Sequence, residues 1–134
     1  MVLPTTLSLA AAAVLINIWH FTRITRARMA GKIVHGDGGD AAMARRVRAH
    51  LNFAEHAPLF LILCGLVEAA GGGGGGGGRW LTILGGAFML ARVAHAIGMD
   101  SPRAHPFRFA GMMATLAIEL ALAVIAVLIL LGRF

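Results

Sequence analysis

Four long apolar stretches constrain this chain more than any other feature of its sequence. They cover residues 3–21, 53–70, 80–97 and 109–131, and each is close to the roughly 20 residues that cross hydrocarbon as a helix. Hydrophobic residues make up 58% of the 134 positions and the mean hydropathy is +0.79, whereas soluble domains are about 45–50% apolar. The sequence therefore predicts an all-α integral membrane protein, with four transmembrane helices in a single four-helix bundle over residues 1–134. The first stretch lacks a basic leader and a small-residue cleavage site, so we expect it to remain as a span.

Basic residues gather at two of the three connections between these stretches. Twelve Lys and Arg against six Asp and Glu give a formal net charge of +6. By the positive-inside rule, the first and third connections are expected to be cytoplasmic and both termini to lie on the other side. We expect these cations to meet lipid head groups or an anionic ligand, and we expect no nucleic acid. The first connection holds Arg23, Arg26, Arg28, Lys32, Arg45, Arg46 and Arg48, the third holds Arg103 and Arg108, and the second holds Arg79.

A polar stripe enters the second apolar stretch from its basic side. Arg48, Asn52 and Glu55 stand at positions i, i+4 and i+7, so they share one face of a helix. Arg92, His95 and Met99 share a face of the third stretch at about the same depth. Ionisable groups at the edge of hydrocarbon are costly, and they usually face a bundle interior and mark a functional site. The pattern predicts a binding pocket near the cytoplasmic surface.

Two other groups lie deeper in the predicted spans. Glu119 stands near the middle of the fourth stretch, where a carboxylate needs a proton or a partner, and Asn17 of the first stretch is a candidate partner. An interhelical polar contact is favoured there over a transport role. Cys64 is the only cysteine of the chain, so no intrachain disulfide can form, and we interpret it as a small buried hydrophobe.

The connections carry turn and cap signals. Asp40 is a good N-cap for a helix that is predicted over 41–70, and the eight glycines of 71–78 predict a flexible link without chemistry. A calcium loop that starts at Asp37 would need a glutamate where the chain has Arg48, so no metal site is expected.

Two segments together resemble the MAPEG family, the membrane-associated proteins of eicosanoid and glutathione metabolism. Segment 48–58 carries the pattern Arg-Ala-x-x-Asn-x-x-Glu-x-x-Pro, and the second segment, 91–98, reads ARVAHAIG. The Gly-Asp-Gly-Gly-Asp loop at 36–40 looks most like bacterial members. With four spans in the right order, the resemblance covers nearly the whole chain.

The resemblance implies a homotrimer in a bacterial inner membrane, with glutathione as co-substrate bound between neighbouring protomers on the cytoplasmic side. It implies that Arg108, or else Arg103, activates the thiol, and we prefer Arg108 because it lies in the first turn of a helix at the membrane. The chain has no tyrosine, and His56 and His95 stand where family members carry one. The glutathione-binding residues that the resemblance implies are Arg48, Asn52, Glu55, His56, Arg92, His95 and, from the first span, Arg28 or Arg26.

These residue types suit the chemistry of glutathione, which has two carboxylates, one ammonium group and a thiol with an ordinary pKa of about 8.5. Arginines hold carboxylates by forked hydrogen bonds, while Glu55 could hold the ammonium and Asn52 the peptide backbone. The Arg108 guanidinium beside the sulfur would lower the thiol pKa and raise the fraction of reactive thiolate. The expected reaction is conjugation of a hydrophobic electrophile, or reduction of a lipid hydroperoxide, that arrives from the lipid bilayer.

Two other interpretations stay open. The missing tyrosines allow a non-catalytic MAPEG relative that binds lipid or a partner protein. A small four-helix multidrug exporter would carry a membrane-embedded acid in its first span, whereas the acids of this chain lie in the second and fourth spans. A thiol other than glutathione is a third open point, because bacteria use several.

Overall fold

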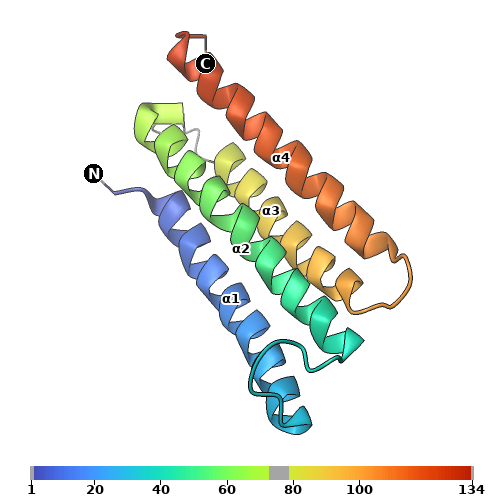
Figure 1. Ribbon diagram of the computed structural model, residues 1–134. Coiled ribbons are helices and arrows are strands. Elements are labelled where there is room, and N and C mark those ends of the chain that lie inside the picture. The colour runs from blue at the N-terminus through green and yellow to red at the C-terminus, as the bar shows by residue number, and fades with distance from the viewer. Residues whose placement is uncertain (1, 73–78, 134) are drawn as a thin grey trace.

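The computed structural model describes residues 2–72 and 79–133, and it is all-helical over these residues. The elements are α1 (Pro4–Gly31), α2 (Ala41–Val67), the short turn η1 (Glu68–Gly72), α3 (Arg79–Met99) and α4 (Pro106–Leu130). The four α-helices run up and down in alternation, and each is long and apolar enough to cross a membrane (Figure 1). The prediction of an all-helical four-span bundle is confirmed, and the predicted homotrimer stays a prediction.

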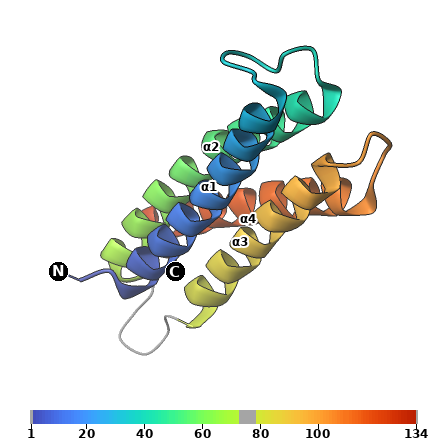
Figure 2. The ribbon, with the colours of Figure 1, turned by 90° about the horizontal axis from the view of Figure 1, so that it is seen from below.

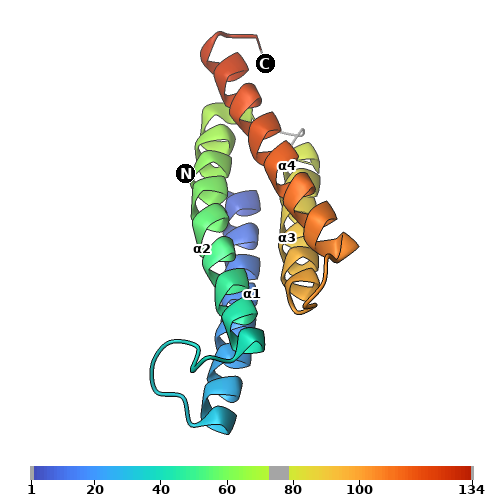
Figure 3. The same ribbon diagram turned by 45° about the vertical axis from the view of Figure 1, so that its right-hand side comes forward.

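The bundle has two ends of different character. Both chain termini lie at one end, which we call the terminal end (Figure 1). At the other end α1 and α3 finish and α2 and α4 begin, and we call it the basic end because it carries the arginines of 23–48 and 103–108. At the basic end, α1 and α2 project beyond the loop that joins α3 to α4 (Figures 1 and 3).

Helix boundaries follow the local sequence. Pro4 and Pro106 stand in the first turns of α1 and α4, where a missing N–H costs nothing. The carboxylate of Asp40 accepts a hydrogen bond from the Ala42 N–H at 2.8 Å, which confirms it as the N-cap of α2. Helix α1 ends at Gly31, and its C-cap residue Lys32 has a left-handed φ of 52°. Gly71 also has a positive φ, 81°, and residues 73–78 of the flexible link predicted over 71–78 lie outside the described residues.

The helices associate as two pairs. Helix α1 packs most closely with α2, and α3 with α4, while contacts between the pairs are sparser. Figure 2 shows the two pairs from below, and Figure 3 shows them side by side at the basic end. Between them lies an apolar core in which the Phe60 and Phe88 rings stack with centroids 3.9 Å apart and Cys64 is buried, as expected from the sequence. The seam between the pairs is therefore the place where a cavity can form most readily.

Two glycines let α3 and α4 approach closely. A Cβ atom on Gly98 would lie 2.2 Å from the backbone nitrogen of Arg108, and one on Gly111 would lie 2.5 Å from the carbonyl oxygen of Ala91. Such distances are possible only without side chains, as is usual where helices pack tightly in lipid. This contact fixes the backbone of Arg108 against the end of α3.

At the terminal end, a carboxylate links the end of α2 to the first turn of α1. Glu68 accepts hydrogen bonds from the Thr5 N–H at 2.9 Å, the Thr6 N–H at 2.8 Å and the Thr6 hydroxyl at 2.7 Å. The N-cap residue of α1, Leu3, provides no side-chain cap of its own. Glu68 therefore supplies from the end of α2 the acceptor that the first turn of α1 requires.

The close approach of α3 and α4 predicts opposite effects for two glycines of α3. We expect Gly98→Ala to lower the free energy of unfolding by about 1–3 kcal/mol or more, because the new methyl group meets backbone atoms that cannot move independently. Gly86→Ala is the matched control, since a Cβ there has nothing within 4 Å and helix propensity gains up to about 1 kcal/mol. Thermal unfolding in detergent measures both. Equal melting temperatures for the two variants would contradict the packing described here.

Candidate functional site

A cavity of about 380 Å³ lies at the basic end, in the seam between the two helix pairs. This volume is within the range of about 300–1,000 Å³ that small-molecule sites occupy. Two guanidinium groups, two imidazoles and one amide lie on its wall, and no carboxylate is among its described lining residues. The lining residues are Arg48, Asn52, His95, Met99, Ala104, His105, Arg108, Phe109 and Met112.

The two helix pairs contribute opposite walls. Arg48 and Asn52 come from α2, one helical turn apart on the same face. His95 comes from α3, and Arg108 comes from the first turn of α4. Segments that are far apart in the sequence therefore bring together cations from both sides of the seam. The polar stripe that the sequence predicts does reach a cavity.

A buried guanidinium orients the amide of Asn52. Arg92 is only 1% exposed, and it donates hydrogen bonds to Oδ1 of Asn52 and, at 3.1 Å, to the hydroxyl of Thr115. Because Oδ1 of Asn52 is used in this way, the amide NH₂ is the group left for the cavity. Arg92 itself is not among the lining residues, so the structure places it behind the wall. Its buried Nε has no hydrogen-bond partner among the described residues.

A backbone contact places His95. Its Nδ1 lies 3.1 Å from the carbonyl oxygen of Arg108, so it can donate a hydrogen bond across the α3–α4 contact. With Nδ1 protonated in this way, Nε2 of a neutral ring is free to accept. The imidazole thus stands in the cavity wall beside Arg108 with a defined orientation.

The outer part of the polar stripe lies on the surface of the single chain. Arg48 and Glu55 form an ion pair at 3.2 Å, and both side chains are more than half exposed. Glu55 is three residues after the cavity-lining Asn52, just under one helical turn, and it does not line the cavity itself. Arg48 therefore joins the cavity to an exposed carboxylate on the adjoining face of α2.

The structure corrects the expected partner of Glu119. Nδ1 of His56 lies 3.0 Å from both carboxylate oxygens of Glu119, so the acid of α4 pairs with α2. Asn17 instead bonds His50, with Oδ1 2.7 Å from Nε2, and the suggestion that it pairs with Glu119 was wrong. His56 is engaged with Glu119 and does not line the cavity.

Of the arginines Arg28, Arg103 and Arg108, only Arg108 lines the cavity. Arg28 donates to the carbonyl of Gly36 at 3.3 Å and lies away from the cavity within one chain. Arg103 is exposed in the α3–α4 loop and is not a lining residue, whereas Arg108 is. Of these two arginines only Arg108 therefore lines the cavity, and its role in activating a thiol stays a prediction.

Four lining residues were not predicted from the sequence, namely Ala104, His105, Phe109 and Met112. A signal for His105 was present, since it precedes Pro106 and its ring caps α4 by accepting from the Phe107 N–H at 3.2 Å. A larger cavity of about 700 Å³ lies between α1 and α3 at the terminal end. Among its described lining residues Arg79 is the only charged one, so it lacks the convergence of cations that marks the first cavity.

The fold and the cavity define a four-helix membrane protein with a cavity lined by cationic side chains at its basic end. A sequence profile of the MAPEG family matches residues 6–128, so the chain belongs to the MAPEG family. It is also similar to the inner membrane protein YecN of Escherichia coli K12, with 30% identity over 93 residues, and equally to YecN of E. coli O6:H1. The match covers 69% of this chain and 66% of YecN, so the chain spans about two thirds of the length of these curated relatives.

The pairing of His56 with Glu119 predicts a non-additive effect on stability. We expect His56→Leu to cost about 1–3 kcal/mol, because it leaves a carboxylate without its partner within a predicted span. The variant with both His56→Leu and Glu119→Leu should be more stable than His56→Leu alone, since no polar group then remains unpaired. Thermal unfolding in detergent of the two single variants and the double variant gives the coupling free energy. Strictly additive losses would show that the two side chains do not interact.

Proposed function

We propose that the cavity at the basic end binds glutathione, or a related anionic thiol, and that the protein conjugates this compound through its sulfur to hydrophobic electrophiles or uses it to reduce lipid hydroperoxides. The observation that carries this proposal is the convergence of Arg48 and Arg108 on one cavity without a carboxylate in its described wall. Membership of the MAPEG family, which includes glutathione transferases, supports it.

The groups around the cavity match the groups of the ligand. Arg48 can hold one carboxylate by a forked hydrogen bond, and the Asn52 NH₂ can donate to a peptide carbonyl. Glu55, beside Arg48, is the carboxylate available for the ammonium group. Arg28 and Glu55 lie outside the cavity of the single chain, so their participation requires a site completed by a neighbouring protomer, as in the homotrimer that we propose.

Arg108 is the proposed catalytic residue because it can stabilise the ionised sulfur. If its guanidinium lowers the thiol pKa from about 8.5 to about 6.5, at a gain of about 2.7 kcal/mol, the thiolate fraction at neutral pH rises from a few per cent to a majority. The thiolate attacks an electrophilic carbon, a C–S bond forms, and the leaving group departs with its electron pair. In the peroxidase reaction two thiols become a disulfide while the hydroperoxide becomes an alcohol and water.

The position of the cavity suits a second substrate that is dissolved in lipid. Phe109 is 69% exposed, and Met112 and Met99 add apolar surface beside Arg108. A hydrophobic compound can therefore reach the sulfur from the bilayer while the charged thiol compound enters from water. By analogy with YecN, we place the protein in an inner membrane, with the basic end toward the cytoplasm and the termini on the other side.

The proposed role of Arg108 predicts a pH-dependent loss of activity. With glutathione and a chromogenic aryl halide, Arg108→Ala should lower the rate about 20- to 30-fold at pH 7, because the thiol returns to its ordinary pKa and is mostly protonated. The deficit should shrink toward pH 9.5, where free glutathione is itself ionised. Arg103→Ala is the matched control, since this arginine lies in the same connection outside the cavity, and its rate should stay within twofold of the wild type.

The same assay separates the competing functions. Turnover that needs the thiol and responds to Arg108→Ala as described supports the enzyme. Binding of glutathione without turnover on aryl halides and lipid hydroperoxides would indicate a non-catalytic relative. A loss in Arg108→Ala that is equal at all pH values would contradict thiol activation by this residue.

A further inference from the structure

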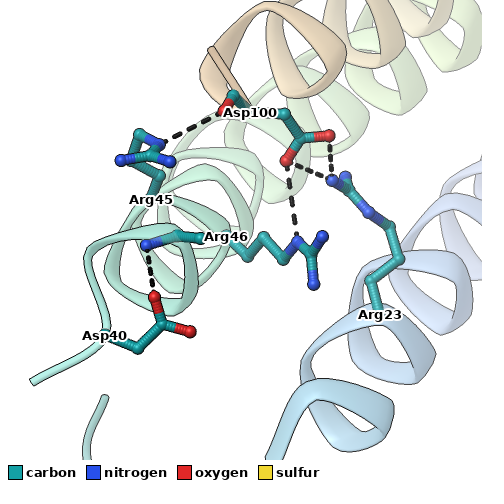
Figure 4. A network of polar contacts seen from close by, with 6 residues as sticks. Arg23, Asp40, Arg45, Arg46 and Asp100 are labelled. Atoms are coloured by element: carbon teal, nitrogen blue, oxygen red, sulfur yellow. Dashed lines mark hydrogen bonds and ion pairs between the residues drawn. The ribbon is translucent and has the colours of Figure 1, made fainter. Parts of the chain in front are cut away.

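One carboxylate joins the two helix pairs at the basic end. Asp100 directly follows α3, and it faces three arginines that belong to the other pair (Figure 4). Its carboxylate accepts hydrogen bonds from the Arg23 guanidinium of α1 and lies 3.8 Å from Nε of Arg46 on α2. Its backbone carbonyl accepts from Nε of Arg45 at 3.3 Å. The end of α3 is thereby tied to both helices across the seam.

The contact is ordered by its surroundings. The Arg23 guanidinium lies 4.6 Å from the centroid of the Trp19 ring, in a cation–π arrangement, and its side chain is only 17% exposed. Beneath it, a small apolar cluster of Ala49, Ala96 and Met99 packs against the same tryptophan. Asp100, whose own side chain is 43% exposed, thus completes a junction that is part apolar and part ionic.

This junction lies beside the cavity. Met99, the residue before Asp100, is a lining residue, and the loop that follows supplies Ala104 and His105 to the same wall. Arg48 lies on α2 two residues after Arg46, and Arg108 is fixed to the end of α3 at Gly98. The position of Asp100 relative to α2 therefore sets the separation of Arg48 from Arg108.

Like charges oppose the closure of this seam. Arg23, Arg45, Arg46 and Arg48 face the seam from one pair, and Arg108 stands on the other. Apart from any ligand, these cations repel one another across it. Asp100 is the described carboxylate that contacts this group from the α3–α4 side, so it offsets the repulsion where the cavity must stay narrow.

We propose that Asp100 is a positioning residue of the cavity: through Arg23, Arg45 and Arg46 it holds the two helix pairs at the separation at which Arg48 and Arg108 contact one ligand molecule. The inference rests on the proposed function for the identity of that ligand. The separation itself is a property of the ligand-free protein, and it can be measured independently.

The first experiment measures the separation without glutathione. Spin labels at Met29→Cys on α1 and Phe107→Cys on α4, both at exposed positions, report the distance between the pairs in a Cys64→Ala background. Labelled chains are diluted with unlabelled chains so that distances within one chain dominate. Asp100→Asn should give a longer and broader distance distribution, and Asp100→Glu should restore most of the wild-type distribution. An unchanged distribution in Asp100→Asn overturns the inference.

The second experiment measures the consequence for the ligand. Asp100→Asn should raise the glutathione KM by about tenfold or more, because small displacements of binding groups are costly, while kcat changes less. Arg23→Gln should have a similar effect, and the double variant should be no worse than either single variant. Glu68→Gln is the control, because it weakens an interhelical clamp at the terminal end, so it should lower the melting temperature and leave KM within twofold.

The outcomes separate the inference from the proposed function. A wild-type protein that fails to bind glutathione, but whose helix pairs separate in Asp100→Asn, would refute the proposed ligand and support the positioning role. Glutathione binding that is equal in wild type and Asp100→Asn would refute the positioning role and leave the proposed function standing. A KM increase of the same size in Glu68→Gln would show that general destabilisation explains the effect of Asp100→Asn, and it would overturn the inference.

Discussion

The guanidinium of Arg92 joins three helices at the depth of the cavity. It reaches from α3 to Asn52 of α2 and Thr115 of α4, and it is almost fully buried. Burying a charged group costs free energy, and here the neutral side-chain oxygens of Asn52 and Thr115 accept its hydrogen bonds. Removing Arg92 would take the donor away from Oδ1 of Asn52 and release the amide that faces the cavity, while the Thr115 hydroxyl would keep its hydrogen bond to the Gly111 carbonyl. The polar interior and the shape of the site therefore depend on the same interaction.

The site is a seam between two stable halves. Glycines let α3 and α4 pack almost as one unit, and α1 and α2 form the other, so the sparser contacts between the halves leave room for a cavity. Cations from both halves meet there, while Asp100 and Glu68 hold opposite ends of the bundle. An arrangement of this kind can bind an anion strongly, because the ligand itself neutralises the charges that otherwise keep the halves apart.

Much of this was predictable from the sequence. Four apolar stretches predicted the four helices, Asp40 predicted the start of α2, and the spacing of Arg48 and Asn52 predicted one wall of a cavity. Periodicity gives the face of one helix, but it does not say which helices meet, so Glu119 was assigned to Asn17 when its partner is His56. Arg92 shows the same limit: its spacing placed it at the right depth, and only the packing shows that it lies behind the wall.

The central claim is that a cationic cavity at the basic end holds an anionic thiol compound with its sulfur ionised. The most direct measurement is the ultraviolet absorbance of the thiolate when glutathione is added to the purified protein in detergent at pH 7, with S-methylglutathione as the blank. We expect a saturable thiolate signal that corresponds to a majority of the bound ligand and falls as the pH is lowered toward 5. Saturable binding of glutathione without thiolate absorbance, or no binding at all, would contradict it.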